Sequence, residues 1–449
     1  LMVAYGMVGA SVSGVSFVSV PGMVATQDLT YLQTCLGFIL GYALVAFVLL
    51  PIYYRLNLTS IYSLLDQRLG AGAYRVGAWF FILSDLIGSA VKFYLVCVIL
   101  QRFVFDAMGM PFWATVPLLV LCIWLYTRRG GVRTLVLTDV VQTTCMLLAL
   151  CLIVWVVVDV LGGWNVVSTV LLPQVFDAPS YSGATGWGHV FDCEDWTSPR
   201  YFWRQFVSGA FIVVVMTGLN QNMMQKNLTC KTLRDAQKDM CLSGVLFLPV
   251  NAIFLLLGVL LLTMRLPAAG DELLPYFVEN LTTGEGGGVL GGALAVRALF
   301  MLGIVSAAFS SADSSLTALT TSFCVDIAAK PDDERLRHRV HILMSALLIA
   351  VVYLLRFVGS QSLIDTVYTL VGYTYGPLLG MFALALLTKH GQRHDINLCF
   401  TAIVCLISPL CCYIISRHCH LGYELLLINA AITFLPLWLY RRIVRKSVG

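Results

Sequence analysis

The sequence predicts an all-α polytopic membrane protein, and three observations support this fold class. Of its 449 residues, 59% are hydrophobic and only 12% are charged, whereas soluble domains average about 45–50% apolar and about 25% charged residues. The apolar residues gather into segments long enough to cross a bilayer as helices, without the alternating short strands of a barrel. Lys and Arg concentrate in alternate connections between these segments. A soluble fold and a disordered chain are therefore excluded.

Twelve apolar segments are predicted to be transmembrane helices, because polar residues or Gly and Pro separate them. Together they form one integral membrane domain, 1–449, whose last part, 396–449, supplies two C-terminal accessory helices. The predicted spans are 2–26, 31–54, 73–101, 112–127, 132–160, 203–224, 242–265, 294–327, 340–358, 362–388, 396–416 and 422–441. The chain starts at Leu1 within an apolar segment, and we expect a further helix ahead of it.

The positive charges orient these spans. With the start of the first span in the cytoplasm, 20 Lys and Arg residues fall on the cytoplasmic side and 7 on the outer side. This count includes Lys226 in a cytoplasmic connection and leaves Lys92 inside the third span. The apolar spacing of the cytoplasmic run 60–70 predicts a short helix on the membrane surface.

The first span is rich in Gly and Ser from Gly9 to Gly22 and contains Pro21, a composition that weakens a helix. An unwound stretch would offer backbone carbonyls to a hard cation. The alternative is that the small residues allow close helix packing.

Polar residues also form a stripe along the eighth span, Ser306–Ser315. Residues 307, 310, 311 and 314 share one helix face, and Asp313 lies at its edge. Hydroxyls and one carboxylate suit a monovalent cation better than Mg²⁺ or Ca²⁺, which usually bind more carboxylates. The alternative is that the hydroxyls bond to carbonyls of their own helix.

Three other charged residues lie inside predicted spans, where charge is costly. Asp139 in the fifth span fits an ion ligand, a proton acceptor or a partner for a nearby Arg. Asp85 and Lys92 share one face of the third span, and Lys92 near the midplane fits either a structural ion pair or a site for an anionic solute. The sequence contains no nucleophile–base pattern, metalloprotease motif or phosphate-binding loop, and its Cys and His lack zinc-ligand spacing. An enzyme, an organic cofactor and a nucleic-acid partner are therefore not predicted.

Several stretches, taken in order, resemble the sodium:solute symporter family, which includes sodium–glucose, proline, pantothenate, iodide and sialic acid transporters. They cover nearly the whole chain. The matching stretches are Gly9–Gly22, Pro51–Gly70 (PIYYRLNLTSIYSLLDQRLG), Gly130–Gln142 (GGVRTLVLTDVVQ), Gly218–Lys226 (GLNQNMMQK), Ser306–Asp326 (SAAFSSADSSLTALTTSFCVD) and Tyr373–Gly380 (YTYGPLLG). Family members begin with one more helix, before the broken one.

The resemblance implies a LeuT-type fold, in which two sets of five helices, here 2–160 and 203–388, are inverted repeats. Broken first and sixth spans would then flank a central site. The implied sodium ligands are carbonyls of the first span and groups of the eighth, Gly9, Val12, Ala307, Ser310 and Ser311. A second cation site, present in some members, maps to Asp139, Ser310, Asp313 and Ser314. Most relatives have a neutral residue in place of Asp313, so this carboxylate either tightens the ion site or shares a proton with Asp139.

The positions that bind sugar in family members differ here, which disfavours a glucose-type solute. The residues at these positions are Ser11 and Ser16 in the first span, Cys35 in the second, Met216 in the sixth and Thr369 in the tenth. Ser11, Ser13 and Ser16 instead resemble the hydroxyl-rich first span of sialic acid transporters. Lys92 falls near their carboxylate-binding Arg, although a Lys offers a point charge rather than a fork.

The sequence therefore predicts a monomeric sodium-coupled secondary symporter of the inner or plasma membrane. It would import a small organic solute by alternating access, with a carboxylate such as a sialic acid as the favoured class. Proton-coupled symport, and sodium symport of a neutral sugar-like or amino-acid solute, are the alternatives. Its partners would be the solute, sodium and the lipid bilayer.

Overall fold

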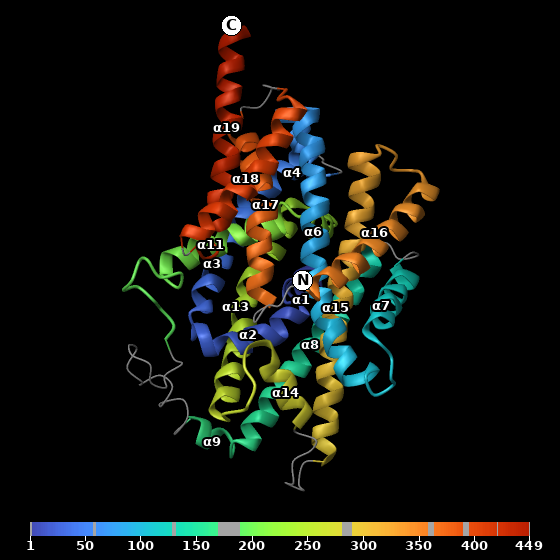
Figure 1. Cartoon of the computed structure of the whole chain (residues 1–449), viewed down its shortest axis with the longest axis vertical. Helices are drawn as coiled ribbons and strands as arrows, with labels where there is room; N and C mark the ends of the chain where they lie inside the picture. The colour runs from blue at the N-terminus through green and yellow to red at the C-terminus, as the bar shows by residue number, and fades with distance from the viewer. Residues whose placement is uncertain are drawn as a thin grey trace.

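The computed structural model describes residues 2–56, 60–127, 132–168, 189–280, 290–357, 363–388, 395–419 and 421–448. Within these ranges every regular element is helical (Figure 1). The α-helices are α1 (Met2–Ser11), α2 (Gly14–Gln27), α3 (Tyr31–Leu44), α4 (Leu50–Leu56), α5 (Ser63–Leu69), α6 (Ala71–Leu100), α7 (Phe112–Thr127), α8 (Val132–Val160), α9 (Trp164–Val166), α11 (Phe202–Val213), α12 (Gln221–Asn227), α13 (Leu233–Thr263), α14 (Leu273–Asn280), α15 (Leu290–Ser322), α16 (Glu334–Leu355), α17 (Leu363–Leu387), α18 (Leu398–His418) and α19 (Leu425–Val448). The π-helical turns are η1 (Val45–Leu49), η2 (Gln101–Phe105), η4 (Val214–Gly218) and η6 (Phe323–Ile327), and η5 (Gly270–Glu272) is a 3₁₀ turn.

Nine helices in the described part of the chain are long and apolar enough to cross a membrane, so the protein is a multi-pass membrane protein. A tenth candidate is a bent pair, Phe202–Gly218 with Gln221–Asn227, whose axes differ by 72°. The other two predicted spans correspond to α7, which has only 16 residues, and to α1 and α2, which a break separates. The number of twelve transmembrane helices stays a prediction.

The distribution of side chains is inverted relative to a soluble protein. Large apolar residues such as Leu125, Trp155 and Leu406 are more than half exposed, as expected of a surface that faces lipid. Charged residues such as Asp139 and Asp313 are almost fully buried. Because charge is costly inside a membrane, the buried charges indicate that the functional groups lie in the interior of the bundle.

The centre of the bundle is formed by α6 and α15, which pack against each other, with α2, α8, α13 and α17 around them (Figure 1). In the apolar stretches of α6 and α17, 67% of the residues are buried, whereas in those of α18 and α19 only 22% are buried. The last two helices pack against α17 at the edge of the molecule. The accessory role of 396–449 stays a prediction.

Glycines allow α3 and α11 to approach closely. A side-chain carbon at Gly37 would overlap the carbonyl of Phe206, and one at Gly41, one helical turn later, would overlap the carbonyl of Ala210. This spacing of small residues is typical of tightly packed transmembrane helices. The second and sixth predicted spans are thus held together through their backbones.

The segment 60–70 was predicted to form a short helix on the membrane surface. It forms the predicted short helix, α5, but the apolar face of this helix packs against protein, so lipid does not cover that face. Ile61, Tyr62, Leu65 and Leu69 are fully buried, because α5 packs against α6 and α17. Its apolar face is covered by the protein rather than by lipid.

Candidate functional site

A central cavity lies where the broken helices meet α6, α15 and α17. The empty space within it and across its open side is about 990 Å³. Its polar lining is Ser11, Ser13, Ser16, Tyr42, Ser84, Asp85, Ser89, Lys92, Thr217, Asn220, Asn222, Lys226, Ser311, Ser314, Ser315, Tyr368 and Tyr375. Phe38, Met216, Phe247 and other apolar residues complete it. The cavity therefore combines hydroxyls, both signs of charge and an apolar wall.

The first break confirms the prediction that the Gly- and Ser-rich first span is interrupted. The helix α1 ends at Ser11 and α2 begins at Gly14, so Val12 and Ser13 lie between them. Ser13 has an extended backbone and its side chain makes no capping hydrogen bond. The Ser11 hydroxyl lies 2.9 Å from the Tyr42 hydroxyl. This break leaves polar groups facing the cavity.

The break lies against the polar stripe of α15. A side-chain carbon on Gly14 would be 3.7 Å from the Ile304 carbonyl oxygen and 3.9 Å from Ala307. Ser311 and Ser314, one turn further, line the cavity, and within the described part of the chain their buried hydroxyl oxygens have no hydrogen-bond partner. The stripe hydroxyls at these two positions are therefore not bonded to their own helix, unlike that of Thr317.

The other sodium ligands of the prediction have different surroundings. Gly9 packs so closely against α8 that a side-chain carbon would overlap Thr143. Val12 and Ala307 are buried, and Ser310 lies in α15 with its side chain outside the described part. The structure thus places Val12, Ala307 and Ser311 around the same junction between the break and α15.

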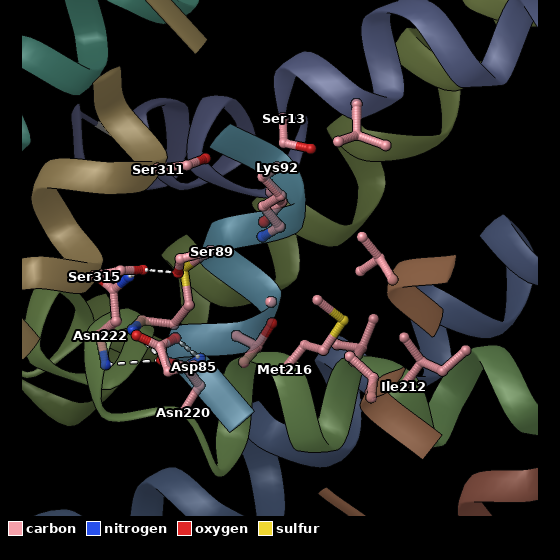
Figure 2. A pocket seen from close by; sticks show the side chains of 18 of the residues that line it. Ser13, Asp85, Ser89, Lys92, Ile212, Met216, Asn220, Asn222, Ser311 and Ser315 are labelled. Atoms are coloured by element: carbon pink, nitrogen blue, oxygen red, sulfur yellow. Dashed lines mark hydrogen bonds between the residues drawn. The ribbon is translucent and has the colours of Figure 1, made fainter. Parts of the chain in front are cut away.

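The wall contributed by α6 has a charge at each end (Figure 2). Asp85 and Lys92 project on one side of this helix, with Gly88 and Ser89 between them. Asp85 is 6% exposed. The Ser89 hydroxyl donates to the Ser315 hydroxyl of α15 at 2.6 Å. No group in the described residues forms a hydrogen bond or an ion pair with the ammonium of Lys92.

The second break separates η4 from α12 and confirms that the sixth span is interrupted. The Asn220 side chain caps α12 by accepting from the N–H groups of Asn222, at 2.8 Å, and Met223, at 3.4 Å. Its amide nitrogen donates to Asp85 Oδ1 and to the Tyr375 hydroxyl, at 2.9 Å each. One side chain thus joins α12, α6 and α17.

Backbone groups at this second break are bonded as well. Tyr53 and Tyr62 donate to the carbonyls of Gly218, at 3.0 Å, and Leu219, at 2.8 Å. The Ile61 N–H donates to Gln221 Oε1 at 3.1 Å. The buried segment before α5 therefore fixes this end of the cavity.

Lys226 corrects the charge count made from the sequence. It is not in a cytoplasmic connection, because it is 3% exposed and its Nζ lies 2.7 Å from Oδ2 of Asp139, which is 1% exposed. The pair joins α12 to α8. Asp139 therefore has a basic structural partner, one of the roles that the sequence left open, although this partner is Lys rather than Arg.

The structure brings most of the predicted solute residues together. Ser11, Ser13, Ser16, Lys92 and Met216 all line the cavity. Two do not. Cys35 is buried beside the cavity without lining it, since Phe38 and Tyr42 form the lining face of α3. Thr369 is exposed, because α17 presents Ile364, Val367, Tyr368, Val371 and Tyr375 to the cavity and places Thr369 on its opposite side.

The sequence did not assign the polar groups at the second break to the site. Asn220, Asn222 and Tyr375 belong to the motifs GLNQNMMQK and YTYGPLLG, so those motifs were the available signal. Asp85 was noticed only as a companion of Lys92. Their roles depend on contacts between helices distant in sequence, which no local pattern encodes.

Comparison with known proteins decides the family. The model of the sodium:solute symporter family matches residues 1–394. The chain belongs to the sodium:solute symporter family. It is 26% identical over 405 residues to the human sodium/iodide cotransporter, covering 86% of this chain and 59% of that protein. It is 25% identical over 404 residues to the sodium/sialic acid symporter NanT of Aliivibrio fischeri, covering 87% of this chain and 76% of that protein.

A solved structure supports the fold of this symporter-family chain. The substrate-bound outward-open state of a Na⁺-coupled sialic acid symporter superimposes with a TM-score of 0.73 at 18% identity, covering 98% of this chain and 89% of that one. At this identity the likeness concerns the fold. The chain spans about three fifths of the length of several curated relatives, among them the sodium/iodide cotransporter. These relatives are transporters rather than enzymes, which agrees with the sequence prediction.

Proposed function

We propose that this protein is a sodium-coupled symporter that imports a small organic anion through the central cavity by alternating access. The observation that carries the solute class is Lys92, whose ammonium lines the cavity and has no ion-pair partner in the described residues. A desolvated ammonium is costly unless an opposite charge approaches it. The carboxylate of a solute would supply that charge.

The ion site of this proposal lies between the first break and α15. Its ligands would be Gly9, Val12, Ala307, Ser310 and Ser311. The buried hydroxyl of Ser311, without a hydrogen-bond partner in the described part of the protein, supports it, because an unsatisfied buried oxygen gains most from a cation. Sodium there would hold α1 and α2 against α15 and complete the solute site. Each positive charge entering would gain about 2.3 kcal/mol per 100 mV of membrane potential.

Coupling through Asp139 is not part of this proposal. Its carboxylate is already neutralised by Lys226 at 2.7 Å, so a second sodium or a transported proton would compete with a built-in cation. Asp313 and Ser314 belong to α15 and lie next to the proposed ion site. We therefore assign coupling to a single sodium near Ser311.

The architecture proposed for this mechanism is the LeuT-type inverted repeat, 2–160 and 203–388. Two broken helices flanking the cavity support it, since discontinuous helices at a midplane site characterise such transporters. We place the protein in the inner or plasma membrane, as a monomer, with the basic connections in the cytoplasm.

Uptake into proteoliposomes tests the proposal. N-acetylneuraminate and short carboxylates should accumulate with an inward sodium gradient, and replacing sodium by choline at fixed pH should abolish uptake. Lys92→Met should abolish anion uptake while leaving sodium-dependent thermal stabilisation intact. Lys238→Met, a matched change at an exposed residue of α13, should have no effect. Uptake that survives in choline would contradict sodium coupling, and full activity of Lys92→Met would contradict the anion site.

A further inference from the structure

Between its two charges, the α6 wall carries only small residues, Gly88 and Ser89, and the Ser89 hydroxyl is already bonded to Ser315. Gly88 lines the cavity, and a side-chain carbon built on it would meet no heavy atom within 4 Å. Positions 85 and 92 share one side of the helix and are separated by about 10 Å along its axis. Figure 2 shows both side chains on the cavity side of α6. Asp85, Gly88 and Lys92 thus form a strip with opposite poles.

The two oxygens of the Asp85 carboxylate differ in their hydrogen bonding. Oδ1 accepts from Asn220 at 2.9 Å. Oδ2 is buried and, among the described groups, none has hydrogen-bond geometry toward it, although Ser315 is adjacent. A buried carboxylate oxygen without a donor is costly. It is therefore available to a donor carried by a solute.

Resting on the proposed function, we infer that the solute is an organic anion that also carries a hydrogen-bond donor. Its anionic group binds at Lys92, its body lies over Gly88, and its hydroxyl or ammonium group donates to Asp85 Oδ2. Asp85 is thus a specificity-determining residue. Simple fatty carboxylates, which lack a second polar group, satisfy only one pole.

Asn220 makes an isosteric test possible. Its Oδ1 is fixed by the two N–H groups at the start of α12, so its amide nitrogen must point at residue 85. In Asp85→Asn the new amide must then present its oxygen to Asn220 and its NH₂ group to the cavity. The substitution changes an acceptor into a donor at the same place.

The experiment measures binding by thermal stabilisation of the full chain in detergent with saturating sodium. The probes are hexanoate, 6-aminohexanoate, 6-hydroxyhexanoate and 5-oxohexanoate. The corresponding acids with four and with eight carbons are measured alongside them. In the unmodified protein the amino or hydroxy acid should half-saturate at about tenfold lower concentration than hexanoate, as expected for a hydrogen bond to a charged group. Whichever of the amino acid and the hydroxy acid binds more tightly identifies the preferred donor as an ammonium or a hydroxyl group.

In Asp85→Asn the preference should reverse. The 6-aminohexanoate advantage should vanish, 5-oxohexanoate should gain, and hexanoate should bind as before. Asp159→Asn, on an exposed residue of α8, should leave every preference unchanged. Equal binding of hexanoate and all polar probes to the unmodified protein, or an unaltered preference in Asp85→Asn, overturns the inference.

Gly88→Leu supplies a second variant that does not alter the polar network. It should fill the strip and weaken all probes at least tenfold while sodium still stabilises the protein. Unchanged probe binding in Gly88→Leu overturns the placement of the solute on α6. If no acid binds in sodium, or if Lys92→Met retains acid binding, the proposed function itself fails.

Discussion

The two helix breaks that face the cavity differ in how their polar groups are satisfied. At the second break, Asn220 caps α12, and Tyr53 and Tyr62 bond the preceding carbonyls. At the first, Ser13 caps nothing, and the nearby Ser311 hydroxyl lacks a hydrogen-bond partner in the described residues. Buried polar groups are normally hydrogen-bonded. The second break is closed by hydrogen bonds within the protein, whereas the first is the break at which we propose that sodium binds.

This contrast separates stability from ion binding. Substitutions at the second break should mainly lower the free energy of unfolding, whereas substitutions at the first should mainly change the response to sodium. Four predictions test it, in order of expected effect.

The largest effect is expected for Lys226→Met. It leaves the Asp139 carboxylate buried without its cation, which should lower the free energy of unfolding by about 3–5 kcal/mol. Denaturant titration in detergent measures this change. Lys226→Met with Asp139→Asn should recover most of the loss, because the uncompensated charge is gone. A single variant as stable as the original protein would show that the pair does not anchor α12.

Asn220→Ala should lower the free energy of unfolding by about 2–3 kcal/mol, because it removes a helix cap and leaves Asp85 Oδ1 without its donor. Thermal unfolding without sodium is the measurement. Ser13→Ala is the matched change at the first break and should stay within about 0.5 kcal/mol. Similar losses in the two variants would remove the distinction between the breaks.

Ser311→Ala should raise the sodium concentration for half-maximal uptake about tenfold, the equivalent of 1.4 kcal/mol. Its stability without sodium should hardly change. Thr321→Ala is the control in the same helix, since the Thr321 hydroxyl bonds the Thr317 carbonyl at 2.8 Å. An unaltered sodium dependence in Ser311→Ala would place the ion elsewhere.

The smallest effect is expected for Tyr62→Phe, which removes one hydrogen bond to the Leu219 carbonyl and should cost about 1 kcal/mol. Because this bond closes the end of the cavity at α5, hydrogen exchange of the segment before α5 should also accelerate. Faster exchange at the first break instead would contradict the assignment of Tyr62 to the second.

Much of this organisation could be predicted from local sequence. The helical spans follow from runs of apolar residues. The low helix propensity of Gly and Ser made a break in the first span one of two interpretations, and the family resemblance favoured it. The hydroxyl stripe of α15 follows from helical periodicity. The cost of polar groups in a membrane predicted that the three serines of the first span and Lys92 face a polar interior. All four residues do line the cavity.

Other features depended on which helices meet. Thr369 and Ile364 belong to the same apolar helix, and only packing decides which side of it faces the cavity. The same is true of Cys35, which lies in α3 beside the lining residues. From the sequence, Lys226 was assigned to a cytoplasmic connection. The structure instead pairs it with Asp139 of α8.

Composition and charge placement alone predicted a helical membrane protein with charged residues inside its spans, and they left open whether the first span is broken or packed through small residues. Those properties depend on composition and on periods of a few residues, both of which can be read from the amino-acid sequence. Only the tertiary structure decided that Lys226 neutralises Asp139, that Asn220 orients Asp85, and that Lys92 lacks a hydrogen-bonding or ion-pairing partner in the described residues. Each of these features depends on helices that are far apart in sequence, and the packing of the bundle decides which helices contact one another.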